Sequence, residues 1–154
     1  MCIRDSYVGG TGSANKLDDY EEGTFTPGLH SAFNGSYSTQ EGIYEKIGSV
    51  VHIQARINLS SKGSQTSQLH FTGLPFAIST SGLQYQMFEV SCINEMDAGN
   101  SNELFVQNQD GNSSTQLAIY SFGIADGDNY SGITINNVGN SFNVNFRGTY
   151  RTSA

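Results

Sequence analysis

The sequence predicts an all-β fold, an antiparallel β-sandwich that is jelly-roll-like, and three observations lead to it. Apolar and polar residues alternate over residues 51–59 and again over residues 142–146. Short runs rich in β-branched and aromatic residues alternate with turns of Gly, Asn and Asp, and no segment longer than a turn has the helical period. Many short strands joined by such turns are typical of sandwiches and jelly rolls.

The first half of the chain contains the clearest expected strand. A short strand is expected at residues 24–26, where Pro27 closes it, and two more candidates lie at residues 36–39 and 42–46. Over residues 51–59 the odd positions are Val, Ile, Ala, Ile and Leu, and the even positions are His, Gln, Arg and Asn. Side chains on a strand alternate between its two faces, so this pattern predicts a half-buried strand.

The second half contains one further alternating strand and several shorter candidates. Residues 142–146 read Phe, Asn, Val, Asn, Phe before Tyr150, and predict a second half-buried strand. Shorter candidates lie at residues 69–72, 86–93, 103–108, 116–122 and 132–136, with longer loops at 78–82 and 94–102. Hairpin turns are expected where Gly combines with residues that tolerate positive φ. These turns are Asn34-Gly35, Lys62-Gly63, Asp110-Gly111, Asp126-Gly127 and Val138-Gly139-Asn140.

The chain divides into three expected parts. Residues 1–6 have neither the apolar core of a signal peptide nor a strand pattern, and we expect a non-native leader of the kind that adaptor read-through leaves on metagenomic assemblies. Residues 7–16 are rich in Gly, Ser and Asn, and predict a flexible connector. Residues 17–154 are expected to form a single β-sandwich domain, and the natural precursor is expected to continue upstream of Tyr7.

Composition and charge exclude several classes of partner. The 154 residues carry a formal net charge of −7, with only 7 Lys and Arg. Phosphate binding needs clustered cations, so no nucleic-acid partner is expected, and an anionic membrane would repel the chain. No apolar run reaches the roughly 20 residues of a membrane-spanning helix, so no membrane insertion is expected. Two cysteines form no disulfide framework, and Cys92 is expected to be a small buried hydrophobe.

The motifs predict no catalytic residue, no metal site and no cofactor. The sequence has no G-x-S-x-G or equivalent nucleophile motif. The histidines His30, His52 and His70 lack the spacing that would place two metal ligands on one face. His52 and His70 fall on expected strands, on faces that we expect to point outward or to line a groove. Paired carboxylates could hydrolyse a glycoside only at a separation that sequence alone does not specify.

A polar loop in the second half holds the candidate binding residues. Asp126-Gly127-Asp128-Asn129 has part of a calcium-loop pattern but no downstream Glu to complete it, so a polar hairpin turn is expected instead. Tyr130 follows in the same loop, and we expect its side chain to be exposed. Tyrosine offers an apolar face and a hydroxyl, which suits subunit interfaces and sugars alike. The candidate binding residues are Tyr130, Asp126, Asp128 and Asn129.

Three motifs flank the alternating strand in the first half of the chain. They are LDDYEEGTFTP at residues 17–27, Y-x-x-Q-x-G-x-Y-x-K-x-G at residues 37–48 and GLPF at residues 73–76. Together with the alternating strand at residues 51–59 they resemble the distal β-domains of bacteriophage tail fibres and related virion proteins, and the resemblance fades after Phe76. It implies a homotrimer that attaches to an upstream fibre segment and presents a host-facing surface, without catalytic residues. Tyr37 and Tyr44, on either side of an expected turn at Gly42, are expected to pack across a hairpin.

One leading function and several alternatives follow. The leading hypothesis is a structural and adhesive module of a phage tail fibre, located in the virion tail. It would recognise a bacterial surface glycan or receptor by surface complementarity and gain avidity from several copies. A free-standing carbohydrate-binding lectin and a capsid decoration protein remain open. A polysaccharide depolymerase is disfavoured because no catalytic motif is present, so we expect that the chain is not an enzyme.

Overall fold

A computed structural model describes residues 6–7, 16–17, 20–30, 32–79, 81, 85–96, 101–108, 115–123 and 130–152 of the chain. Strands form nearly all of the regular structure in these ranges, together with one short 3-10 helix, η3. The elements are β1 (Ser6–Tyr7), β2 (Lys16–Leu17), β3 (Tyr20–Phe25), β4 (Gly28–Leu29), β5 (Ser36–Ile47), β6 (Val50–Ser61), β7 (His70–Thr72), β8 (Met87–Met96), β9 (Ser101–Asn108), β10 (Leu117–Gly123), β11 (Tyr130–Gly132), η3 (Ile135–Asn137) and β12 (Val138–Arg151).

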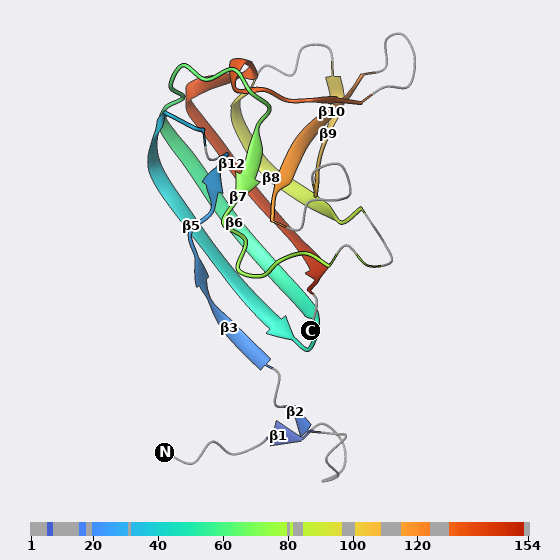
Figure 1. Ribbon diagram of the computed structural model, residues 1–154. Coiled ribbons are helices and arrows are strands. Elements are labelled where there is room, and N and C mark those ends of the chain that lie inside the picture. Colours follow the sequence, from blue (N-terminus) through green and yellow to red (C-terminus); the bar gives the residue numbers. More distant parts are fainter. Residues whose placement is uncertain are drawn as a thin grey trace.

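The strands from β3 onward form one antiparallel sheet. Its order is β3-β5-β6-β12-β8-β9-β10-β7-β4, and β11 pairs with β10. The sheet curls so that β7 and β10 come to lie over β6 and β12 (Figure 1). β1 and β2 pair with each other in a separate two-stranded sheet. The expected all-β antiparallel class is therefore confirmed.

The two layers that enclose the core are parts of this single sheet, whereas the sequence predicted a jelly-roll-like sandwich. β8 joins the layers because its first residues pair on both sides. Phe88 lies opposite Gly148 of β12 and opposite Val106 of β9. The ladder of hydrogen bonds thus passes from one layer into the other, and the result is a curled half-barrel. Alternating hydrophobicity predicts which side chains face inward, but not whether two layers share a strand.

The core fills the inside of the curl. In β6 the apolar odd-numbered residues of the segment 51–59 are buried, and the polar residues at positions 52, 54 and 56 are exposed. In β12 Phe142, Val144 and Phe146 are buried in the same way. β7 meets β12 across the core, where the rings of Phe71 and Phe146 stack with centroids 4.6 Å apart. Both alternating strands predicted from the sequence are therefore confirmed.

Four local features differ from the prediction. Residues 36–47 form one strand, β5, because Gly42 lies within the ladder and the chain reverses at Gly48, where φ is 58°. The turn expected at residues 138–140 is the beginning of β12, and the strand expected at 132–136 ends at Gly132 and gives way to η3. The loop expected at 94–102 is shorter, since β8 runs to Met96 and β9 begins at Ser101.

Other expected turns fall in different places. Gly63 has the positive φ expected there, 71°, but Lys62-Gly63 is not a hairpin turn, because β6 pairs with β5 and β12 and not with the next strand, β7. Asn34-Gly35 lies in the bend that leads into β5. The turns expected at Asp110-Gly111 and Asp126-Gly127 lie outside the described residues, as do the side chain of Cys92 and most of residues 1–15.

Three glycines of the sheet lie under aromatic rings of neighbouring strands. Gly23 and Gly42 are opposite Tyr44 and Phe25 in the pairing of β3 with β5, and Gly148 is opposite Phe88 in the pairing of β12 with β8. A Cβ atom would come within 2.9 Å of the ring at Gly23, and within 2.5 Å at Gly42 and at Gly148. The absence of a side chain lets each ring lie flat on the opposite backbone, which fixes the register of these strands.

Candidate functional site

The motif residues of β5 point toward the core side of the sheet. Tyr37, Gln40, Tyr44 and Lys46 are half-buried and Gly42 is buried, whereas positions 41, 43, 45 and 47 between and after them are exposed. Successive side chains of a strand point to opposite faces, which places Gln40, Gly42, Tyr44 and Lys46 on one inward face. The register shift on either side of Tyr37 brings that residue to the same face. The motif is therefore a packing pattern.

Two side chains of this pattern hold the segment around Pro27. The Tyr37 hydroxyl accepts a hydrogen bond from the backbone N of Leu29 at 2.8 Å. Gln40 Nε2 donates to the carbonyl oxygen of Pro27 at 2.9 Å. Partial burial raises the pKa of Tyr37. These bonds give partners to backbone groups of Pro27 and Leu29, and they attach the end of the LDDYEEGTFTP segment to β5.

Tyr44 and Tyr150 connect the sheet to the GLPF turn. The Tyr44 hydroxyl donates to Glu21 Oε1 at 2.7 Å, and this bond to a carboxylate raises the pKa of the tyrosine. The Tyr44 ring meets Phe76 edge-on, with centroids 5.3 Å apart, and Lys46 Nζ lies 5.8 Å from the centroid of the same ring. The Tyr150 hydroxyl donates to the carbonyl oxygen of Phe76 at 3.0 Å, and burial raises the pKa of Tyr150 to about 12.

The expected packing of Tyr37 against Tyr44 across a hairpin is wrong. Both residues lie on β5, because no turn interrupts that strand at Gly42. Tyr37 instead packs against Phe33, with ring centroids 5.0 Å apart, and Tyr44 packs against Phe76. The three motifs thus build the scaffold, and a surface free to meet another molecule lies on the opposite side of the sheet.

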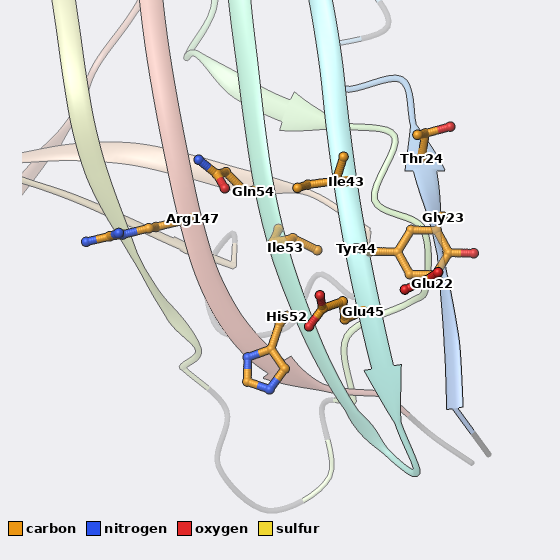
Figure 2. Close-up of a pocket in the computed structure, with 10 residues that line it drawn as sticks. All are labelled: Glu22, Gly23, Thr24, Ile43, Tyr44, Glu45, His52, Ile53, Gln54 and Arg147. Carbon is orange, nitrogen blue, oxygen red and sulfur yellow. The ribbon is translucent and has the colours of Figure 1, made fainter. Parts of the chain in front are cut away.

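That outer side carries an open groove of about 530 Å³ across β3, β5, β6 and β12 (Figure 2). Glu22 and Glu45 lie toward one side of the groove, and His52, Gln54 and Arg147 lie toward the other. All five side chains are exposed. The groove therefore offers carboxylates, an imidazole, an amide and a guanidinium to whatever approaches this face.

Strand register arranges these groups in rows. Glu22 of β3 lies directly opposite Glu45 of β5, which lies opposite His52 of β6. His52 lies opposite Thr149 of β12, with Nδ1 2.8 Å from Oγ1. Like charges directly opposite each other on a sheet repel, so the glutamate pair costs stability while the face is solvated.

A second row ends in an ion pair. Arg147 Nε and Nη2 donate to the two carboxylate oxygens of Glu89 at 2.9 and 3.1 Å. This bidentate bond lowers the pKa of Glu89 and raises that of Arg147. Both side chains are exposed, so the pair contributes little to stability and leaves the guanidinium at the surface.

The first row has the chemical order carboxylate, imidazole, hydroxyl. Hydrolases use such a row in a water-excluded site, with donors aimed at the oxyanion that forms. Here Glu45, His52 and Thr149 are all exposed, and among the described residues the imidazole bonds to the hydroxyl and not to the carboxylate. The outer face thus presents these groups to solvent and not in a water-excluded site.

The structure does not test the candidate residues taken from the sequence. Asp126, Asp128 and Asn129 lie outside the described residues. Tyr130 begins β11, where its backbone pairs with Phe122 of β10, and the placement of its side chain is also outside the description. The expectation that these four residues bind a ligand stays a prediction.

The histidines differ in their surroundings. His52 is exposed on the outer face, as expected. The outward placement expected for His70 is wrong: its side chain is only 7% exposed, and its ring meets that of His30 with centroids 5.7 Å apart. Leu69 and Phe71, the residues on either side of His70, are buried as well. The described residues contain no group of three or more His, Cys, Asp or Glu placed to hold a metal ion.

A search of the described residues for membrane-spanning helices finds none of sufficient length and apolarity.

The outer-face groove was missed at the level of sequence because its residues come from distant parts of the chain. His52 and Thr149 are 97 residues apart. The available signal was the set of polar and charged residues that alternate with the core positions of 51–59. Reading that signal as a surface required the order and register of β3, β5, β6 and β12, which no local pattern specifies.

Comparison with known proteins identifies a fold. No protein-family model and no curated protein sequence matches the chain. The crystal structure of the Dettilon tailspike protein (gp208) matches with a TM-score of 0.70 and 17% sequence identity, over 86% of this chain and 24% of the tailspike chain. The chain thus spans about a quarter of that tailspike's length and shares the fold of that part.

Proposed function

We propose that this chain is a structural and adhesive module of a phage tail fibre or tailspike, located in the virion tail, which acts by non-covalent recognition. The observation that carries the proposal is the shared fold with a segment of a tailspike over 86% of the chain. The packing roles of the three motifs support it, because the residues behind the resemblance to tail-fibre domains are those that close the N-terminal half of the curl.

The proposed partners follow from the net charge of the chain and from the presence of several copies on one particle. The module is a homotrimer joined to an upstream fibre segment, and its partner on the host is a bacterial surface glycan or receptor. A net charge of −7 supports a partner that is neither nucleic acid nor an anionic membrane. Three copies on one particle multiply a weak individual contact into avidity. No cofactor is proposed for the module.

Recognition, and not catalysis, is the activity that the outer face supports best. Its carboxylates and its imidazole–hydroxyl contact are exposed, and solvent weakens the electrostatic stabilisation on which hydrolysis depends. The 126–130 loop is the proposed contact with the host, because surface loops carry most binding specificity. Tyr130 is the proposed anchor within it.

A bacterial glycan array tests the adhesive role. The full chain is expected to bind a subset of bacterial surface glycans, and Tyr130→Ala is expected to weaken that binding at least tenfold, as loss of an aromatic anchor does at other interfaces. Tyr85→Ala is the control, since Tyr85 is an exposed tyrosine, 53% accessible, outside the loop.

The outcomes separate the alternatives. Binding by a protein that stays monomeric would favour a free-standing lectin. A trimer that binds no glycan and no bacterial cell would favour a capsid decoration protein. Equal binding by wild type and Tyr130→Ala would remove the 126–130 loop from the proposal.

A further inference from the structure

The groove on the outer face continues into two neighbouring hollows. Ile43 and Gln54, which line the groove, also line a hollow of about 330 Å³ over β5, β6 and β12. His52 and Arg147 are shared in the same way with a hollow of about 390 Å³ over β6, β12 and the start of β8. The three hollows form one open depression along β6, here called the outer trough. From His52 to Arg56 it spans about 13 Å, at about 3.3 Å per residue of a strand.

The walls of the outer trough carry planar polar groups. Gln54 offers an amide, His52 an imidazole, Glu45 a carboxylate, and Arg56 and Arg147 guanidiniums, and all of these side chains are exposed. Carboxylates, amides and guanidiniums present two polar atoms side by side, so that each can bond two neighbouring hydroxyls at once. Neighbouring hydroxyls on a rigid ring are the defining feature of sugars. The trough therefore has the chemistry of a glycan site.

Ile43 gives the trough an apolar centre. Figure 2 shows its side chain between those of Thr24 and Gln54, its partners in the strand register, and it is 56% exposed. A sugar ring has a face of C–H groups and an edge of hydroxyls, so a ring over Ile43 can bond the Gln54 amide with its edge. Such a ring removes apolar surface from water, which favours binding.

The guanidiniums of the trough already have acidic partners. Arg147 bonds to both carboxylate oxygens of Glu89, and Arg56 lies opposite Glu41 in the strand register. A ligand carboxylate or phosphate would have to compete with these glutamates for the cations. The trough therefore disfavours acidic glycans, although it contains two arginines.

Glu22 and Glu45 select the opposite charge. They lie directly opposite each other on β3 and β5, and within the described part of the chain neither takes part in a salt bridge. Like charges in this position repel, and a positive group on a ligand relieves that repulsion. An amino group on a sugar is such a group, whereas an acetylated amino group carries no charge.

We infer that the outer trough binds a short oligosaccharide that carries positively charged amino groups. One ring lies over Ile43, its hydroxyls bond the planar side chains along β6, and an amino group lies between Glu22 and Glu45. This site is separate from the 126–130 loop and gives the module a second contact with the host. The inference rests on the proposed function and adds to it a class of glycan and the residues that select it.

Three probes of similar length separate the contribution of charge from that of shape. The glucosamine trimer, used near pH 6 so that its amino groups are charged, is expected to bind the full chain in isothermal titration calorimetry. The N-acetylglucosamine trimer has the same rings without the charge, and trilysine has the charge without the rings. Each is expected to bind at least tenfold more weakly, because each lacks one of the two features that the trough recognises. Equal binding by trilysine would show recognition of charge alone and would overturn the inference.

A matched pair of variants tests the two carboxylates. Glu22→Gln/Glu45→Gln keeps the shape of the trough and removes both charges, so affinity for the glucosamine trimer is expected to fall at least tenfold. Ser131→Lys/Asn136→Lys shifts the net charge by the same amount at exposed positions outside the trough, and it should bind like wild type. Urea midpoints close to wild type show that the variants remain folded.

Gln54 tests the wall of planar groups and the openness of the trough. Gln54→Ala is expected to weaken binding of both sugar trimers, because it removes an uncharged contact that they share. The thiol of Gln54→Cys, followed at that position by peptide mass spectrometry, should react with a maleimide as fast as that of Ser131→Cys, and the glucosamine trimer should slow it. Slow labelling without ligand would show that another part of the assembly covers the trough, which would overturn the inference.

The remaining outcomes separate this inference from the proposed function. Tyr130→Ala should bind the glucosamine trimer like wild type, since the loop is a separate site. Glycan-array binding that Tyr130→Ala abolishes, together with no binding of the glucosamine trimer, removes the trough and leaves the adhesive role. Unchanged affinity of Glu22→Gln/Glu45→Gln for the trimer also removes it. Absence of binding to every glycan, on the array and in solution, removes both.

Discussion

Gly42 has no side chain, and the Phe25 ring occupies the space above it. The same relation holds between Gly23 and the Tyr44 ring. At these positions the identity of one residue depends on the size of its partner in the adjacent strand. This dependence was invisible in the sequence, where Gly42 indicated a turn, because a glycine in a turn and a glycine under a ring read alike.

Gly42→Ala is therefore expected to destabilise the protein by about 1–3 kcal/mol, through displacement of the Phe25 ring. An added Cβ would lie 2.5 Å from a ring carbon. Gly28→Ala is the matched control, because there the nearest atom to an added Cβ, Thr72 Oγ1, lies at an ordinary 3.4 Å. Urea unfolding of both variants measures the difference, and equal losses would argue against the ring as the cause.

Tyr150 makes the stability of the folded protein depend on pH in the alkaline range. Burial raises its pKa from 10.0 to about 12, so the folded state holds the phenol proton more tightly than the unfolded state. The stabilisation is complete below pH 10 and is lost as pH rises toward 12. The two-unit shift corresponds to roughly 3 kcal/mol at most.

Tyr150→Phe is expected to flatten this dependence. Its urea midpoint should fall less than that of wild type between pH 9.5 and 11.5, while at neutral pH it loses only the bond to the Phe76 carbonyl, about 1 kcal/mol. Tyr37 and Tyr44, whose pKa values are also raised, keep some alkaline sensitivity in the variant. Identical pH profiles for the two proteins would exclude Tyr150 as the source.

At the scale of elements, the GLPF turn is the point where separate strands are joined. Phe76 meets Tyr44 and Lys46 of β5 through its ring, and Tyr150 of β12 through its carbonyl. β3 depends on Phe76 indirectly, because Tyr44, which packs against Phe76, also donates a hydrogen bond to Glu21 of β3. An edge strand with a single neighbour is thus held by contacts beyond its own ladder.

Phe76→Ala is expected to cost about 2–3 kcal/mol and to act locally. Loss of the ring frees Tyr44, so amide hydrogen exchange should accelerate in β3 and β5 before it does in β10. Leu104→Ala, at another half-buried apolar residue in β9, should leave exchange in β3 unchanged. Uniform acceleration in all strands would show that the turn has no special relation to β3.

The positions of most strands were predictable from the sequence, but which strands pair with one another was not. The alternation of apolar and polar residues over 51–59 identified the buried side of β6 without any knowledge of the neighbouring strands. η3 was missed because the polar contacts that shape it, such as Thr134 N donating to Asn137 Oδ1 at 3.0 Å, interrupt an otherwise β-rich run. The burial of His70 depends on which strands cover β7, a property of the sheet order.

At the scale of the whole molecule, the curl separates two kinds of surface. The core side carries the inward residues of the motifs, and the outer side carries the charged rows, to which the LDDYEEGTFTP segment contributes Glu22. Most residues of the candidate site come from positions that the three motifs leave open, so the motifs could indicate a class of fold without indicating that site. That site exists only once β12 lies beside β6, across most of the length of the chain.

β12 has a ladder on each side, with β6 and with β8. Tension applied along this strand would load both ladders of hydrogen bonds in shear, so that the bonds must rupture together and not one after another. Resistance to such pulling comes from the central position of one long strand with a neighbour on each side.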